Sequence, residues 1–104
     1  MSEDTRDRFV KTLKALANPT RLTILASLAV KPKHAYALAK ELKLSYPLTH
    51  LHLKGLRKMG LVEEIKAELK AEGHPTTKTY APTNFEIVLT AENIRQIFSE
   101  GDES

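Results

Sequence analysis

Residues 46–58 carry hydroxyl, imidazole and cationic side chains and contain no acidic residue. On a helical wheel of about 100° per residue, this stretch separates into two faces. The predicted packing face carries Leu48, Thr49, His52, Leu53, Leu56 and Met59. The predicted outward face carries Tyr46, His50, Lys54, Arg57 and Lys58, with Pro47 at its edge. Such a face suits the major groove of DNA, which is lined by phosphates and base edges. The alternative is a solvated helix face that binds nothing.

The sequence offers little for catalysis or metal binding. It has no cysteine, which excludes disulfides, thiolate metal sites and cysteine nucleophiles. His50 and His52 lie about 200° apart around a helix, so they cannot share one metal ion. We expect His52 to be packed or to act as a cap, and we expect His34 and His74 to lie in loops, in solvent. No Ser/His/Asp set, glycine-rich phosphate loop or pair of acids suggests an active site. The sequence therefore predicts no enzyme, no metal and no cofactor.

The positive charge is concentrated around the stretch described above. Residues 1–30 have a net charge of +2, residues 31–58 carry seven cations and one acid, Glu41, and residues 59–104 have a net charge of −5. This local excess, rather than the overall charge of +3, is what a polyanion-binding surface requires.

A chain of 104 residues allows one domain with one small core, so residues 1–104 are predicted to form a single unit. We expect residues 1–4 and 101–104 to be disordered. No apolar run approaches the roughly 18 residues of a membrane span, and no signal-like stretch opens the sequence. These features predict a cytoplasmic protein that does not contact membranes.

Two short helices and a tight turn are predicted around the cationic stretch. Residues 35–42 place apolar side chains at helical spacing. Ser45 is an N-cap for the helix that follows, and Pro47 is tolerated in a first turn that needs no donor. Lys43 stands where glycine often adopts a left-handed conformation, which would cost about 1 kcal/mol for a non-glycine residue.

The flanking segments complete the layout. Helices are predicted over residues 5–17 and, after the Asn18-Pro19 start signal, over residues 19–28, followed by a linker at 29–33. The second of these helices is expected to bury Leu22, Ile24 or Leu25, and Leu28.

After Gly60 the apolar residues alternate, which predicts a strand through Ile65, a turn at 72–75 and a returning strand over 77–82 that continues to Leu89. Thr90 is expected to cap a last helix over 91–99. The fold class is therefore mainly α with a small β-hairpin (α+β). The order of elements is that of a winged helix-turn-helix, in which the hairpin is the wing.

Two blocks of this sequence, LKALANPTRLTILASL at 13–28 and LSYPLTHLHLKGLRKMGLVEE at 44–64, resemble the ArsR-type winged-helix transcription regulators. The resemblance covers about residues 9–65. It implies that six residues approach DNA, namely Ser45, Tyr46, Pro47, Leu48, His50 and Lys54. It also implies that Arg21 supports the fold and that two copies pair through their first and last helices.

The departures from the family pattern limit what can be transferred. Metal-sensing members bind metal through cysteines in the segment that reads Ala35-Tyr36-Ala37-Leu38 here, or through Asp and His on the last helix, which has no His here. Neither known metal site is therefore supported. Leu48 replaces a common Thr and Thr49 a common Val, so the base-reading set does not carry over.

The remaining predicted sites are a wing and a dimer interface. The wing residues expected to make backbone contacts are Lys70, His74 and Lys78. The first and last helices carry more apolar side chains than one small core requires. These side chains, which we assign to a shared dimer core, are Phe9, Val10, Leu13, Ile94, Ile97 and Phe98.

The sequence thus predicts a homodimeric winged-helix repressor that binds double-stranded DNA through residues 46–58. A protein-docking module of transcription or replication machinery is the alternative. Binding of RNA or single strands is disfavoured because few aromatic residues are available for stacking. The sequence identifies no small-molecule effector.

Overall fold

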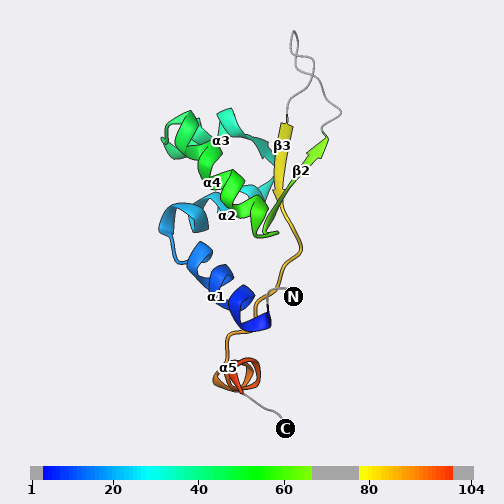
Figure 1. The fold of residues 1–104 in the computed structure, drawn as a ribbon. Helices are drawn as coiled ribbons and strands as arrows, with labels where there is room; N and C mark the ends of the chain where they lie inside the picture. The colour runs from blue at the N-terminus through cyan, green and yellow to red at the C-terminus, as the bar shows by residue number, and fades with distance from the viewer. Residues whose placement is uncertain (1–3, 67–77, 100–104) are drawn as a thin grey trace.

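The computed structural model describes residues 4–66 and 78–99 (Figure 1). In chain order the elements are α1 (Thr5–Leu16), α2 (Pro19–Val30), β1 (Lys33–His34), α3 (Ala35–Leu42), α4 (Tyr46–Lys58), β2 (Val62–Lys66), β3 (Lys78–Pro82) and α5 (Ala91–Phe98). This order confirms the predicted winged helix-turn-helix, with α3 and α4 as the helix pair and β2 and β3 as the described part of the wing. Residues 67–77, which contain the predicted turn and the wing residues Lys70 and His74, lie outside the described residues.

A side chain caps the start of each described helix. Asp4, Asn18, Ser45 and Thr90 each accept a hydrogen bond from the backbone N–H three residues later. His34 does the same for α3 through its ring nitrogen Nδ1, so the prediction of a solvated loop histidine was wrong. Asp4 was expected in a disordered end and instead fixes the start of α1, because its carboxylate satisfies a free N–H there.

The core lies where α2, α3 and α4 meet the sheet. Its largest fully buried side chains are Ile24, Leu28, Leu38, Leu53, Leu56 and Thr49. The prediction that Leu22 is buried was wrong, because Leu22 lies roughly 160° around the helix from Ile24 and is 51% exposed. Leu25, by contrast, is buried together with Ile24. Residues 29 and 30, assigned to the linker, continue α2 to Val30.

The sheet has the order β1-β3-β2, with both pairs antiparallel. The sequence did not reveal β1, whose two residues pair with Thr79 and Tyr80 of β3. The predicted continuation of β3 to Leu89 was also wrong: residues 83–90 have no regular secondary structure. Because Pro82 already pairs with Val62, the first residue of β2, the chain beyond it has no strand opposite.

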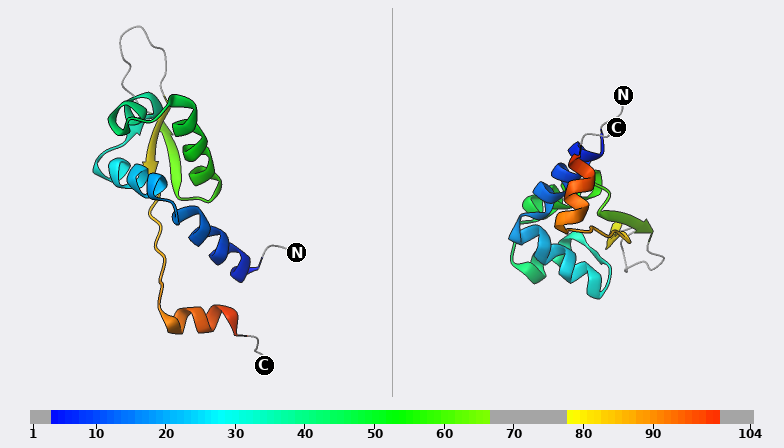
Figure 2. Two further views of the ribbon diagram at one scale, coloured as in Figure 1. Left: turned by 90° about the vertical axis from the view of Figure 1, so that its left-hand side faces the viewer. Right: turned by 90° about the horizontal axis from the view of Figure 1, so that it is seen from below.

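Helices α1 and α5 extend away from this body (Figures 1 and 2). Residues 83–90 run down to α5, which lies beside α1 at the far end. Phe9 and Phe98 meet edge to face, with ring centroids 6.4 Å apart. No residue of α5 is buried, so its apolar side has little cover from the described part of this chain.

The turn between α3 and α4 gives the first prediction. Lys43 has φ 57° and ψ 46°, in the left-handed region that a side chain disfavours. Replacing Lys43→Gly should therefore raise the free energy of unfolding by about 1 kcal/mol, measured by urea denaturation at fixed protein concentration. Lys43→Ala removes the same charge and keeps the Cβ atom, so it should give no such gain. Equal stabilities of the glycine and alanine variants would contradict this account.

Candidate nucleic-acid interface

One face of α4 is held in the core, which fixes the direction in which the other face points. Thr49, Leu53 and Leu56 are at most 1% exposed. The Thr49 hydroxyl donates to the carbonyl of Ser45 at 2.9 Å, so this buried polar group has a partner. These residues lie at helical spacing, and their burial leaves α4 no freedom to rotate about its axis.

The opposite face of α4 is open, as predicted. Tyr46 is 47% exposed, and Lys54, Arg57 and Lys58 are exposed as well, while His50 is half-buried. Placing Leu48 on the packing face was wrong, because it lies about 100° from Thr49 and is 41% exposed. Leu51, which the sequence analysis passed over, is 62% exposed. The helical wheel could have placed it, since it lies roughly 20° from Lys58.

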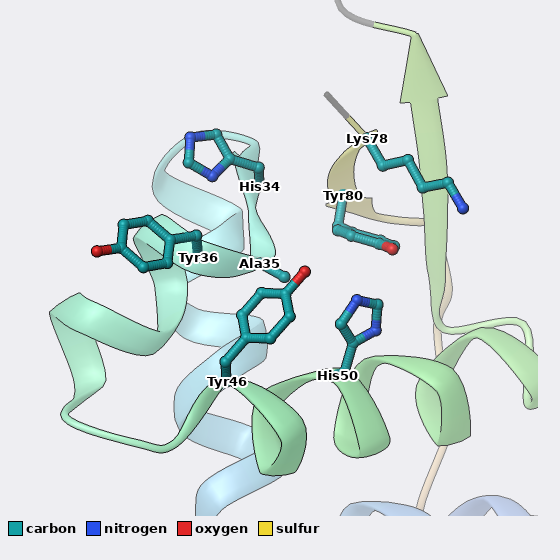
Figure 3. Close-up of a pocket in the computed structure, with 7 residues that line it drawn as sticks. All are labelled: His34, Ala35, Tyr36, Tyr46, His50, Lys78 and Tyr80. Atoms are coloured by element: carbon teal, nitrogen blue, oxygen red, sulfur yellow. The ribbon is translucent and has the colours of Figure 1, made fainter. Parts of the chain in front are cut away.

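Tyr46 and His50 form one unit at the start of α4 (Figure 3). Their rings meet edge to face with centroids 5.0 Å apart, on successive turns of the helix. Ser45 lies just before them, and its hydroxyl oxygen accepts from the N–H of Leu48 at 3.1 Å. The Ser45 hydroxyl therefore caps the helix and still has a proton to donate.

The cations of α4 differ in their surroundings. Arg57 forms an ion pair with Glu64 of β2 at 3.2 Å, which links the helix to the wing. The structure gives no ion-pair partner for Lys54 or Lys58 within residues 4–66 and 78–99. The sequence pattern did not reveal the Arg57 pair, because α4 itself contains no acid and Glu64 comes from a strand.

Arg21 of α2 braces the back of α4. Its Nε donates to Nδ1 of His52 at 3.2 Å, and its Nη1 donates to the carbonyl of Ala15 at 3.5 Å. The guanidinium also lies against Gly55, where a Cβ atom would come within 2.9 Å of Nη2. Glycine inside a helix costs up to about 1 kcal/mol relative to alanine, and here it makes room for the arginine. These contacts agree with the supporting role that the family resemblance implied for Arg21.

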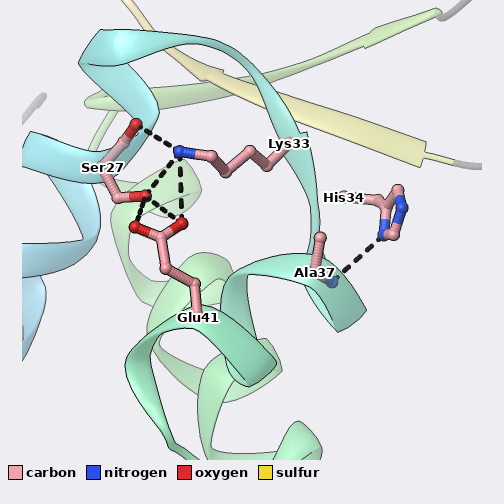
Figure 4. A network of polar contacts seen from close by, with 5 residues as sticks. All are labelled: Ser27, Lys33, His34, Ala37 and Glu41. Carbon is pink, nitrogen blue, oxygen red and sulfur yellow. Dashed lines mark hydrogen bonds and ion pairs between the residues drawn. The ribbon is translucent and has the colours of Figure 1, made fainter.

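A second polar cluster anchors α3 (Figure 4). The Ser27 hydroxyl donates to the Glu41 carboxylate at 2.9 Å, and the Lys33 ammonium donates to both the hydroxyl and the carbonyl of Ser27 at 2.8 Å. Lys33 also pairs with Glu41 at 3.3 Å. The hydrogen bond from Ser27, followed by that from Lys33, lowers the pKa of Glu41. The only acid of residues 31–58 is thus held against Lys33, away from α4.

The other predicted groups are placed as follows. Lys78 begins β3 and is exposed. Helices α1 and α5 leave Val10 37%, Ile94 40% and Phe98 41% exposed. The described residues contain no group of three potential metal ligands. None of the described helices is long and apolar enough to cross a membrane.

Comparisons with known proteins agree with this geometry. Residues 18–64 match the family described as bacterial regulatory protein, arsR family. An uncharacterised HTH-type transcriptional regulator from Methanocaldococcus jannaschii is 39% identical over 89 residues, covering 86% of this chain and 90% of that protein. Among solved structures, an ArsR-like transcriptional regulator from Rhodococcus sp. RHA1 is 28% identical with a TM-score of 0.65, over 76% of this chain and 68% of that chain. The homodimeric winged helix-turn-helix DNA-binding domain of a Mycobacterium bovis protein is 32% identical with a TM-score of 0.60, over 73% of this chain and 64% of that chain.

The bond from Arg21 to His52 gives the second prediction. Burial, together with the charge of Arg21, lowers the pKa of His52 in the folded state. The unfolded chain then binds more protons, so the stability from His52 is complete above its unfolded pKa of about 6.5 and is lost as the pH falls below it.

Wild-type protein should lose free energy of unfolding between about pH 7 and pH 5. His52→Asn, whose amide oxygen can accept from Arg21 without titrating, should lose less over the same interval. Urea titrations at fixed protein concentration measure this difference, and identical pH profiles for the two proteins would refute it.

Proposed function

This chain belongs to the ArsR family of bacterial regulatory proteins, which are winged helix-turn-helix transcription regulators, and from that premise we propose that it is a homodimeric repressor that reads duplex DNA with α4. The observation that carries the proposal is the open side of α4, which presents hydroxyl, imidazole and cationic groups without an acid. We further propose that the whole chain acts as one such domain, in the cytoplasm where it meets DNA.

The outward side chains divide by the part of DNA that each can reach. Lys54 and Lys58 supply phosphate contacts and hence affinity, because a flexible ammonium makes a charged contact that carries no sequence information. Arg57 also contacts a phosphate while it remains in its ion pair with Glu64, at 3.2 Å. The proposed wing residues make contacts to the DNA backbone that are weaker than those of α4; these residues are Lys70, His74 and Lys78.

Base preference comes from the first half of α4. Tyr46 and His50 carry groups that hydrogen-bond base edges, and Ser45 and Pro47 set the approach of the helix start. Leu48 is 41% exposed, so its methyl groups can contact the methyl group of thymine.

Two copies of the chain are needed to bind a site with two half-sites, because each copy places only one α4 helix in a major groove. Six residues of α1 and α5 form the proposed shared core, namely Phe9, Val10, Leu13, Ile94, Ile97 and Phe98. Ile94 and Phe98 are 40% and 41% exposed in one chain, which leaves apolar area for a second copy to cover. A twofold axis there would set two α4 helices into successive major grooves, about 34 Å apart. Repression is then the direct result of occupying promoter DNA.

The general test is a titration with random duplex DNA at two salt concentrations. Lys54 and Lys58 of the two protomers should by themselves release about four counterions, so the slope of log K against log salt should be about −3.6 or steeper, because Arg57 and the wing cations add to it. Binding that does not depend on salt, or no binding, would contradict the proposal and favour a protein-docking module.

Lys54 and His50 should affect binding in different ways, which is the third prediction. Lys54→Ala should weaken binding to every duplex alike and reduce the salt slope by about 1.8 per dimer. His50→Ala should alter the ranking of duplex sequences. Lys14→Ala removes the same charge from the exposed side of α1 and should leave both properties unchanged. Equal effects of the Lys54 and His50 variants on all sequences would show that this division is wrong.

The dimer interface gives the fourth prediction. Ile94→Asp places a charge in the proposed apolar interface, so it should shift the protein to monomer in sedimentation equilibrium and lower the affinity for a two-half-site duplex. Gln96→Asp introduces the same charge on the polar side of α5 and should remain dimeric. A wild-type monomer at tens of micromolar would rule out the interface.

A further inference from the structure

A pocket of about 400 Å³ lies between the start of α4, the start of α3 and strand β3 (Figure 3). Its polar lining comes from three tyrosines, two histidines and a lysine, and no carboxylate belongs to it. The polar residues that line it are His34, Tyr36, Tyr46, His50, Lys78 and Tyr80.

Tyr80 is the unusual member of this lining. It belongs to the central strand β3, between Lys33 of β1 and Glu64 of β2, and only 4% of it is exposed. None of the described residues forms a hydrogen bond with its hydroxyl. Buried polar groups in proteins are nearly always hydrogen-bonded, so this hydroxyl calls for a partner that the described chain does not supply.

The hydroxyl of Tyr80 is a donor under ordinary conditions. Burial, and then the nearby charge of Glu64, raise the pKa of Tyr80, so the phenol keeps its proton. Glu64 is itself paired with Arg57 at 3.2 Å. The protonated phenol can therefore donate a hydrogen bond to an acceptor that enters the pocket.

Other donors converge on the same space. Figure 3 shows the side chains of Tyr46 and His50 directed toward Tyr80, whereas the ring of Tyr36 points away. Lys78, at the rim, adds a positive charge. Hydroxyl, imidazole and ammonium groups are donors that bind an oxyanion, and hydrogen bonds to a charged oxygen are among the strongest. The nearby carboxylate of Glu64 lies outside the lining and is paired with Arg57.

We propose that this pocket is a phosphate subsite, in which the Tyr80 and Tyr46 hydroxyls and one nitrogen of the His50 ring donate to the oxygens of one phosphate group beside Lys78. The Tyr46 oxygen and the second His50 nitrogen are then left to accept a hydrogen bond from a base edge. This inference rests on the proposed DNA binding and deepens it. A helix in the major groove and a wing over the neighbouring minor groove lie on either side of one DNA strand, whose phosphates run between them. The pocket lies between α4 and β3, where that strand would pass.

The phosphate can come from the DNA backbone or from a free phosphate compound, and the experiment separates the two. Binding of a duplex obtained by selection is measured by fluorescence anisotropy for wild type, Tyr80→Phe and Tyr46→Phe. A series of duplexes each carries one methylphosphonate, which replaces a charged phosphate oxygen by a methyl group. Tyr36→Phe is the matched control, because it removes a hydroxyl that points out of the pocket. Thermal unfolding of each variant checks that it is folded.

For a backbone phosphate, Tyr80→Phe should weaken binding about tenfold per half-site, and hence about a hundredfold for the dimer, the loss expected for one hydrogen bond to a charged group in each copy. Tyr46→Phe should also weaken binding, and because Tyr46 is exposed this substitution should not disturb the fold. Tyr36→Phe should leave binding unchanged. One methylphosphonate position in each half-site should weaken wild-type binding, and the same replacement should cause a smaller loss in Tyr80→Phe, because one of its contacts is already gone.

For a free phosphate compound, Tyr80→Phe should bind DNA as tightly as wild type does. Inorganic phosphate and pyrophosphate should then shift the NMR signals of His50 in wild type and not in Tyr80→Phe. The subsite is refuted by the following combination of results. Wild type binds DNA, but each methylphosphonate weakens binding by the same factor in wild type and in the tyrosine variants, and neither inorganic phosphate nor pyrophosphate binds at the pocket. Failure of wild type to bind any duplex would instead refute the proposed function.

Discussion

The burial of one side of α4 is the constraint on which the rest of the structure depends. Thr49, Leu53 and Leu56 pack into the core beside Ile24 and Leu38, and none of these five is more than 1% exposed. Truncating one such leucine typically lowers the free energy of unfolding by about 2–5 kcal/mol. The packing of the buried residues, and not the surface residues, therefore sets the orientation of α4. Since α4 cannot rotate, the positions of its outward groups are set by its buried ones.

The polar contacts of the fold then leave that outward side cationic. Glu41 is bound by Ser27 and Lys33, and Glu64 by Arg57, so two acids near the helix pair are neutralised within the fold. Arg21 points the other way and braces the back of α4 through His52. These contacts serve stability first. Their consequence for function is that Lys54 and Lys58 extend from a surface with few negative charges nearby.

The helix-turn-helix could be predicted almost residue by residue, because its signals are local. Ser45 caps α4, Pro47 fits its first turn, and Lys43 takes the left-handed turn conformation. The errors concern features that depend on distant partners. Strand β1 exists only because β3 lies beside it, and residues 83–90 form no strand because no strand lies opposite.

The candidate site shows the same division between local and distant information. The outward face of α4 follows from the helical period; of its exposed residues, Leu48 was assigned to the packing face and Leu51 was left unassigned. The Arg57–Glu64 pair and the pocket around Tyr80 join segments far apart in the sequence. The spacing of residues along the sequence does not predict such contacts between distant segments, so only the three-dimensional structure reveals them.

The central claim is that two copies of α4, fixed by their buried sides and related by a twofold axis, enter successive major grooves. Selection of bound sites from a random duplex pool, with competitor DNA at physiological salt, tests it most directly. The account predicts a near-palindromic motif with half-sites about ten base pairs apart, centre to centre. A pool without enrichment, or an enriched motif with a single unpaired half-site, would contradict it.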